Sequence, residues 1–187
     1  MRKLIVFNNV SLDGYFVDAH ASMMWAHAGS EEPEFAAFSA ANASGDGCLL
    51  FGRVTYDLMA SYWPTPAAMQ QLPTVAAGMN RMPKVVFSRT LTHAAWNNTR
   101  VLSGDLVQEV RQLKAEPGPG LCILGSGSIV AQLAPAGLID ELQLIVNPIA
   151  LGSGRSLFAG MPAPVNFQLS RSRTFNNGKV YLSYTPA

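Results

Sequence analysis

Two glycine-containing turns in the sequence carry side chains that suit a phosphate group. The first is Phe51-Gly52-Arg53-Val54-Thr55-Tyr56, which lies between an apolar run and a helical pattern. A helix N-terminus offers free N–H groups and the positive end of the helix dipole, and both favour anions. Gly52 permits close approach of the backbone, Thr55 supplies a hydroxyl and Arg53 supplies charge. The turn is therefore a candidate phosphate site, and the alternative is an ordinary strand-to-helix turn with a solvated arginine.

The second turn is Leu124-Gly125-Ser126-Gly127-Ser128-Ile129-Val130, which again joins an apolar run to a helical pattern. It begins like the dinucleotide fingerprint G-x-G-x-x-G, but Val130 occupies the third glycine position. No acidic residue ends a second strand at the expected distance, so a Rossmann domain is disfavoured. The turn indicates a general phosphate site, or a tight turn that needs small residues for packing.

A third segment, Val85-Val86-Phe87-Ser88-Arg89, ends in a hydroxyl and a guanidinium. Ligands of open α/β sheets lie beyond the carboxyl ends of the strands. Three strand ends with phosphate-binding chemistry together indicate one extended phosphorylated ligand.

A fourth segment, 11–18, contains Asp13-Gly14 within a long stretch that has no steady period. Asp13 is a candidate catalytic carboxylate, and an ordinary turn residue is the alternative. The stretch from Val10 to Ser30 is predicted to be a loop, and loops of this length are usually functional.

The elements that must position these turns alternate between strands and helices. Strands are predicted at 2–9, 47–51, 84–88, 121–124 and 141–148, and helices at 31–43, 54–61 and 126–134. The segment 101–114 is predicted to run from a short strand into a helix capped by Ser103, and Ser30 is predicted to cap the helix at 31–43. The segment 63–83 contains four prolines and is predicted to be irregular, with at most one helical piece.

This alternation predicts an α/β fold with a mixed, mostly parallel central sheet and helices on both faces. The segment 167–184 reads as two strands around Asn176-Asn177-Gly178, and Asn-Gly is a strong hairpin signal. We therefore expect a C-terminal antiparallel hairpin at one edge of the sheet.

Composition limits the classes of function. The chain has 187 residues, 49% hydrophobic and 13% charged, which fits a single domain spanning 1–187 with a substantial core. A formal net charge of +1 argues against a nucleic-acid partner or an anionic membrane. Cys48 and Cys122 lie in apolar runs and are expected to be reduced and buried, as in a cytoplasmic protein. His20 and His27 lack neighbouring ligands, so no metal site is expected.

Taken together, the motifs resemble the dihydrofolate-reductase-like family over nearly the whole chain. The resemblance is closest to the reductase (C-terminal) domain of the bifunctional riboflavin-biosynthesis enzyme and its free-standing relatives. The segments that carry it, in order, are Ser11-Leu12-Asp13-Gly14-Tyr15, Phe51-Gly52-Arg53-Val54-Thr55-Tyr56, Val86-Phe87-Ser88-Arg89, Gly125-Ser126-Gly127-Ser128, Leu138-Ile139-Asp140-Glu141-Leu142 and Pro148-Ile149-Ala150-Leu151-Gly152-Ser153-Gly154.

The resemblance implies that the chain binds NADPH. The implied cofactor residues are Asn8, Asn9, Phe16, Gly52, Arg53, Thr55, Ser88, Arg89, Gly125, Ser126, Gly127, Ser128 and Ile129. Arg53 and Arg89 would face the 2′-phosphate, which favours NADPH over NADH because arginine binds phosphate bidentately. The Gly125-Ser126 bond corresponds to a cis peptide in reductases of this family. Asn8, Asn9 and Phe16 would lie near the nicotinamide.

The resemblance also suggests catalytic and substrate-binding residues. Glu34 falls on the carboxylate position of the first helix in dihydrofolate reductases, where it would support protonation, and a solvated first-turn glutamate is the alternative. Arg155 is a candidate contact for a substrate phosphate. The Trp-Pro motif of true dihydrofolate reductases is missing, Tyr56 replaces a usual Trp and Ser126 replaces a Gly, which disfavours folate as the substrate.

The expected function is therefore an NADPH-dependent reductase. It would transfer hydride to a small heterocyclic or ribosylaminopyrimidine-type substrate, as in the riboflavin-pathway reductase. The alternatives are a non-catalytic NADP-binding dimeric module and a dihydrofolate reductase with weak activity. The relatives commonly dimerise, so the resemblance also implies a homodimer.

Overall fold

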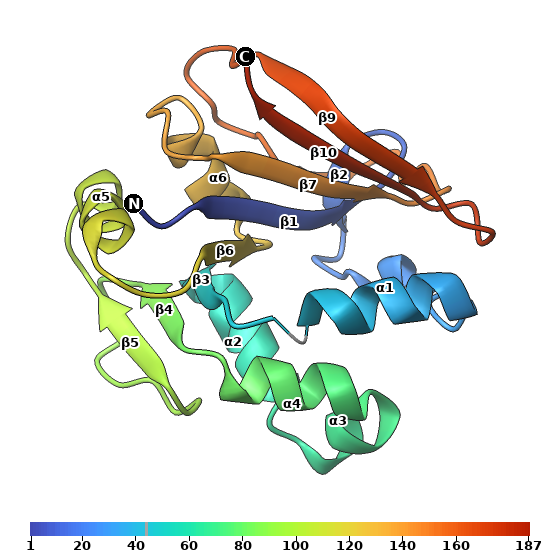
Figure 1. The fold of residues 1–187 in the computed structure, drawn as a ribbon, viewed down its shortest axis with the longest axis horizontal. Coiled ribbons are helices and arrows are strands. Elements are labelled where there is room, and N and C mark those ends of the chain that lie inside the picture. The colour runs from blue at the N-terminus through green and yellow to red at the C-terminus, as the bar shows by residue number, and fades with distance from the viewer. Residues whose placement is uncertain (44) are drawn as a thin grey trace.

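An eight-stranded sheet forms the centre of the protein in the computed structural model, which describes residues 1–43 and 45–187 (Figure 1). The strand order is β5-β4-β3-β6-β1-β7-β10-β9. The strands of this sheet are β1 (Leu4–Val10), β3 (Cys48–Gly52), β4 (Lys84–Phe87), β5 (Thr99–Leu102), β6 (Leu121–Leu124), β7 (Glu141–Val146), β9 (Phe167–Thr174) and β10 (Val180–Pro186). Two short strands, β2 (Tyr15–Asp18) and β8 (Gly154–Ser156), pair separately with each other.

The sheet is mostly parallel. β1 pairs in parallel with β6 and β7, and β3 pairs in parallel with β4 and β6, while β10 runs antiparallel to β7 and β9. The predicted fold class and the C-terminal hairpin are thus confirmed. Because the carboxyl ends of parallel strands lie at the same edge, the turns that follow β1, β3, β4 and β6 lie at one edge of the sheet.

Alternation along the strands divides the core between the two faces of the sheet. Leu50 of β3 packs with α5 (Leu106–Ala115) and α6 (Gly127–Leu133), whereas Leu49 and Phe51 pack with α2 (Arg53–Tyr62) and α4 (Pro73–Arg81). A smaller cluster joins Phe35 of α1 (Pro33–Ala43) to Ile145 and Phe175. Helices therefore cover both faces, as the alternating pattern predicts (Figure 1).

The segment 63–83 differs from its prediction. It contains α3 (Pro66–Gln71) and α4, and each of these helices has proline at its first position. Proline at that position removes an N–H that has no intrahelical acceptor, so it starts a helix rather than interrupting one. The prediction of an irregular segment was wrong because the prolines were interpreted only as helix breakers.

The long loop and two helix caps also differ from their predictions. The stretch 10–30 contains β2 and a 3₁₀ turn, η1 (Met24–His27). The carboxylate of Glu32, not Ser30, accepts the N–H groups at the start of α1, and Asp105, not Ser103, caps α5. Within the described residues, no helix is long and apolar enough to cross a membrane.

Candidate functional site

The two glycine-containing turns are in direct contact. β3 lies between β4 and β6, so the turns that follow these three strands are neighbours. The backbone N–H of Gly52 donates a hydrogen bond of 2.8 Å to Oγ of Ser126. The turn after β3 is thereby fixed to the turn after β6, although 74 positions separate the two residues in the sequence.

Close packing explains why glycine occupies two positions of the second turn. Gly125 has φ +63°, and a Cβ there would lie 3.1 Å from Cγ2 of Thr55. A Cβ at Gly127 would lie 2.9 Å from the ring of Phe16 and 3.0 Å from the carbonyl oxygen of Leu157. Thr55 and Phe16, both predicted cofactor residues, therefore contact the turn directly.

The backbone at Gly125 and Ser126 differs from the cis geometry that the family resemblance suggested for comparison. The described residues contain no cis peptide bond, and both residues adopt a left-handed conformation, with φ +63° and +59°. A serine in this conformation is uncommon, since the region favours glycine. The turn is thus a bend of two left-handed residues, and the hydrogen bond from Gly52 to Ser126 stabilises it.

Two helix N-termini without side-chain caps lie at this edge. Gly52 is the N-cap of α2 and Ser126 is the N-cap of α6, and neither makes a side-chain cap hydrogen bond. The hydroxyl of Ser126 accepts from the other turn instead of from its own helix. Both first turns therefore retain N–H groups for an anion, and Val54 and Ser128 in these turns are exposed.

The third strand end adds cationic and polar groups. Gly52 of β3 is in register with Phe87 of β4, so Ser88 and Arg89 lie beside the first turn. Oγ of Ser88 accepts the N–H groups of Thr90 and Leu91 and thereby shapes this bend.

The two candidate arginines differ in their surroundings. Nε of Arg53 donates to Oδ2 of Asp57 at 2.6 Å, with both side chains substantially exposed. Arg89 is exposed and forms no ion pair with any residue that the structure describes. Arg89 is thus the guanidinium at this edge that is free to bind an anion.

Asn8 carries buried polar atoms that have no partner. It lies near the carboxyl end of β1, with only 2% of its surface exposed. Neither Nδ2 nor Oδ1 has a hydrogen-bond partner among the described residues. Leaving a buried amide unsatisfied costs about 1–3 kcal/mol, so such an amide is a candidate contact for a ligand. This orphaned amide and the two uncapped turns fit a bound dinucleotide.

Asn9 points to the opposite face of β1 and joins a polar chain that the sequence did not reveal. Oδ1 of Asn9 accepts from Nδ2 of Asn147 at 3.2 Å. Oδ1 of Asn147 accepts from Nζ of Lys179, which also donates to the carbonyl oxygen of Ala26 at 2.8 Å. Lys179 is 1% exposed and lies 5.0 Å from the centre of the Phe35 ring. Its position beside a hairpin turn gave no signal that it would be buried.

Glu34 is engaged by an arginine from the C-terminal hairpin. Oε1 of Glu34 lies 2.5 Å from Nη2 of Arg173, and both side chains are nearly half exposed. The guanidinium of Arg173 also lies 4.9 Å from the centre of the Phe175 ring. The ion pair connects α1 to β9 and occupies Oε1 of this carboxylate.

Asp13 accepts hydrogen bonds from two loops. Its carboxylate accepts from Oγ of Ser11 at 2.6 Å, from N of Leu151 at 3.1 Å and from N of Gly152 at 2.7 Å. These bonds, that from Ser11 above all, lower the pKa of Asp13 to about 2. Asp13 is therefore ionised at neutral pH and poorly suited to donating a proton.

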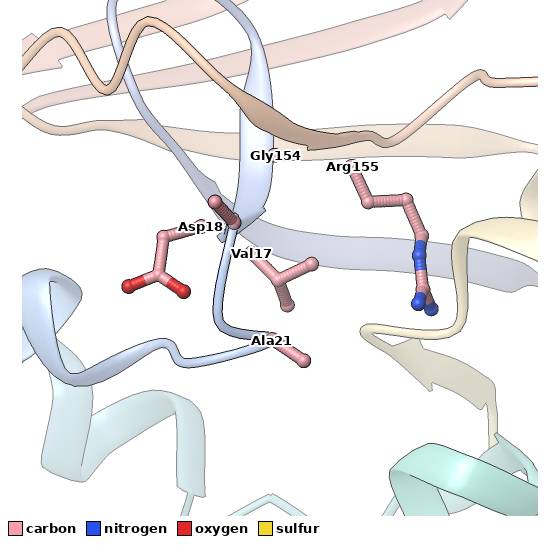
Figure 2. Close-up of a pocket in the computed structure, with 6 residues that line it drawn as sticks. Val17, Asp18, Ala21, Gly154 and Arg155 are labelled. Carbon is pink, nitrogen blue, oxygen red and sulfur yellow. The ribbon is translucent and has the colours of Figure 1, made fainter.

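Arg155 lines a hollow of about 210 Å³ beside the antiparallel pair of β2 and β8. Figure 2 shows its guanidinium extending into the hollow, with the carboxylate of Asp18 on the other side. Glycine at position 154 is needed for this pairing, because a Cβ there would lie 2.2 Å from the carbonyl oxygen of Val17. Arg155 therefore lies two residues from Leu157, whose carbonyl oxygen packs against Gly127.

Comparison with known proteins agrees with this geometry. The family described as "RibD C-terminal domain" matches residues 2–181. A curated relative, "Uncharacterized protein YyaP" from Bacillus subtilis (strain 168), is 27% identical over 183 residues, which cover 98% of this chain and 94% of the relative.

Three solved structures share the fold. A "Putative riboflavin biosynthesis protein" from Shewanella sp. PV-4 has a TM-score of 0.74 and 24% identity, covering 100% of this chain and 99% of that chain. A pyrimidine reductase-like protein from Corynebacterium diphtheriae has a TM-score of 0.67 and 14% identity, covering 100% and 92%. A diaminohydroxyphosphoribosylaminopyrimidine deaminase/5-amino-6-(5-phosphoribosylamino)uracil reductase from Thermotoga maritima has a TM-score of 0.69 and 12% identity, and this chain covers 57% of it.

Proposed function

Because the chain belongs to the RibD C-terminal domain family, we propose that it is an NADPH-dependent reductase that acts on a small heterocyclic or ribosylaminopyrimidine-type substrate. The observation that carries this proposal is the contact between the two uncapped turns, made by the hydrogen bond from Gly52 to Ser126. Backbone N–H groups at a helix N-terminus bind phosphate, and this edge of the sheet offers two such sets side by side.

The residues of the chain divide the task of binding the cofactor. The first turns of α2 and α6 would hold the phosphates, and Arg89 would hold the 2′-phosphate. The amide of Asn8, buried near the end of β1, would bind polar atoms at the nicotinamide end. When bound, NADPH would supply the hydride, while the protein supplies orientation and a proton path.

The position of Arg155 favours a substrate that carries negative charge. Its guanidinium forms no ion pair with a described residue and faces the hollow beside the pair of β2 and β8 (Figure 2). Arginine binds phosphate through two parallel hydrogen bonds. A ribose phosphate on the substrate would give this cation a partner.

The second candidate function is a nucleotide-binding module without turnover. It is favoured by one observation, which is that both candidate proton donors have other partners. Glu34 forms an ion pair with Arg173. Asp13 accepts hydrogen bonds from one donor in its own loop and from two backbone N–H groups at 151–152. The two functions separate in an assay of NADPH oxidation with dihydrofolate, pterins and aminopyrimidines. Consumption of NADPH favours the reductase, and binding without consumption favours the module.

The cofactor site is tested with Arg89→Glu. Titration calorimetry of NADPH and NADH should show that the variant loses about tenfold or more of its affinity for NADPH, because a charge-assisted contact is replaced by repulsion. Its affinity for NADH, which lacks the 2′-phosphate, should change little. The matched control is Arg111→Glu, an exposed arginine on α5, which should behave like the wild-type protein. Equal losses for the two nucleotides in Arg89→Glu would remove the 2′-phosphate assignment, and a wild-type protein that binds neither would remove the proposed function.

A further inference from the structure

In the hydrogen-bonded chain from Lys179 through Asn147 to Asn9, each side chain can act only as donor or only as acceptor toward its neighbour. The carbonyl oxygen of Ala26 can only accept, and it takes one N–H of Lys179. A second N–H of Lys179 goes to Asn147, which must therefore present its oxygen to the amine. Burial lowers the pKa of Lys179, yet a neutral amine also carries two N–H donors for these acceptors.

Backbone carbonyl groups fix the orientation of the Asn147 carboxamide independently of Lys179. The two N–H groups of its Nδ2 are shared among three acceptors, which are the carbonyl oxygens of Ile145 and Val10, at 3.1 Å and 3.3 Å, and Oδ1 of Asn9, at 3.2 Å. Exchanging its oxygen and nitrogen would place an acceptor against these two carbonyls and a donor against Lys179. Such a reversal would leave several buried groups unsatisfied, which is costly.

The fixed orientation of Asn147 also fixes the orientation of the Asn9 carboxamide. Because Asn147 presents its nitrogen, Asn9 must present its oxygen, and Oδ1 of Asn9 is the atom in contact at 3.2 Å. The Nδ2 group of Asn9 then remains, and no described residue accepts its N–H groups. Asn9 is half-buried and, in register with Ile145, faces the side of the sheet that α1 covers.

We infer that Lys179 and Asn147 are positioning residues that fix the carboxamide of Asn9 as a hydrogen-bond donor to the substrate. The substrate must then carry an acceptor, a ring carbonyl oxygen, at this point, and an amino group there is excluded. The inference rests on the proposed function, since it takes the ligand on the α1 side of β1 to be the heterocyclic substrate. Asn9, which the resemblance places among the cofactor residues, is thereby assigned to the substrate, and Asn8, on the opposite face, is left to the cofactor.

The test compares two probes of the same shape. One is an aminouracil, and the other is the aminopyrimidine in which amino groups replace both ring carbonyls. Titration calorimetry, with and without saturating NADP⁺, should show that the wild-type protein prefers the aminouracil by about tenfold, since the wrong partner leaves a donor facing a donor. Asn9→Asp replaces the donor with an acceptor of equal size and should reverse the preference. Asn97→Asp, at an exposed asparagine, should leave the preference unchanged.

A change at Lys179 tests the positioning role itself. Lys179→Met removes the donor that fixes Asn147, so the preference should fall toward equal binding while the probes still bind. Lys179→Arg keeps a donor and should retain the preference. If Lys179→Met does not fold, Asn9→Asp still decides the matter, because only a direct role in recognition reverses a preference.

The outcomes separate this inference from the proposed function. Equal binding of the two probes to the wild-type protein, binding of neither probe, or an unchanged preference in Asn9→Asp would overturn the inference. A protein that oxidises NADPH but shows no preference would keep the function and lose the inference. A protein that prefers the aminouracil but does not bind NADPH would keep the inferred role of Asn9 and lose the proposed function.

Discussion

At the scale of single residues, the carboxylate of Asp13 connects the loop after β1 to the loop at 151–152 through three hydrogen bonds, and it accepts a fourth from Oγ of Ser11 within its own loop. These bonds lower its pKa from 3.8 to about 2. A carboxyl group with a lowered pKa in the folded state stabilises the protein above the pKa of the unfolded state. The stabilisation is lost as the pH falls from about 4 through 2.

We therefore expect the Asp13→Asn variant to have a lower thermal midpoint than the wild-type protein at neutral pH, and the difference to shrink between pH 4 and pH 2. Circular dichroism melts across this range measure it. Asp46→Asn is the control, because the side chain of Asp46 is 93% exposed. A difference that stays constant down to pH 2 would mean that Asp13 does not act through its ionised form.

The residues of the candidate site were predictable to different degrees. The glycines and Ser126 could be predicted because a turn between a strand and a helix is a local pattern. Asn147, Lys179 and Arg173 could not, because their partners lie far away in the sequence, as in the 139 positions between Arg173 and Glu34. No local pattern reports such a pairing.

At the scale of elements, a buried lysine closes the carboxyl end of α4. Nζ of Lys84 donates to the carbonyl oxygens of Met82 and Asn80 at 2.6 Å and 3.2 Å, and it lies 4.5 Å from the centre of the Trp96 ring. The last carbonyls of a helix have no intrahelical donor, so a cation there satisfies them and complements the helix dipole.

Replacing Lys84 with methionine should therefore lower the free energy of unfolding by about 1–3 kcal/mol, because the carbonyl of Met82 loses this donor and that of Asn80 keeps only the 3.4 Å bond from Nδ2 of Asn98. Urea denaturation measures this change. The control is Lys3→Met, at an exposed lysine, which should cause little loss. A Lys84→Met variant as stable as the wild-type protein would show that water or another group satisfies these carbonyls.

Most elements were predictable because their hydrophobic period is local, and the exceptions have physical causes. Prolines at the first positions of α3 and α4 resemble breakers unless their place within a helix is known. The caps of α1 and α5 were assigned to serines, although acidic residues two positions further on make the hydrogen bonds. Cap chemistry was thus recognised, but the first residue of each helix was misplaced.

At the scale of the whole molecule, the outer strands expose an apolar face. Leu144 of β7 pairs with Leu182 of β10, and both are half-buried. Tyr184, two residues along the same face, pairs with Leu169 of β9, which is 51% exposed. β9 is also an edge strand of 8 residues, none of them buried. A long exposed edge beside an apolar face is a site for pairing with another chain.

We expect this face to be the interface of a homodimer, since a two-fold axis would bring one patch onto the same patch of a second copy. Sedimentation equilibrium should then give twice the chain mass of 20.0 kDa. Leu169→Asp places a charge in the patch and should shift the protein toward the monomer. Leu58→Asp, at a leucine on α2 that is 49% exposed, should leave the dimer intact. A wild-type monomer, or dissociation caused only by Leu58→Asp, would place the interface elsewhere or remove it.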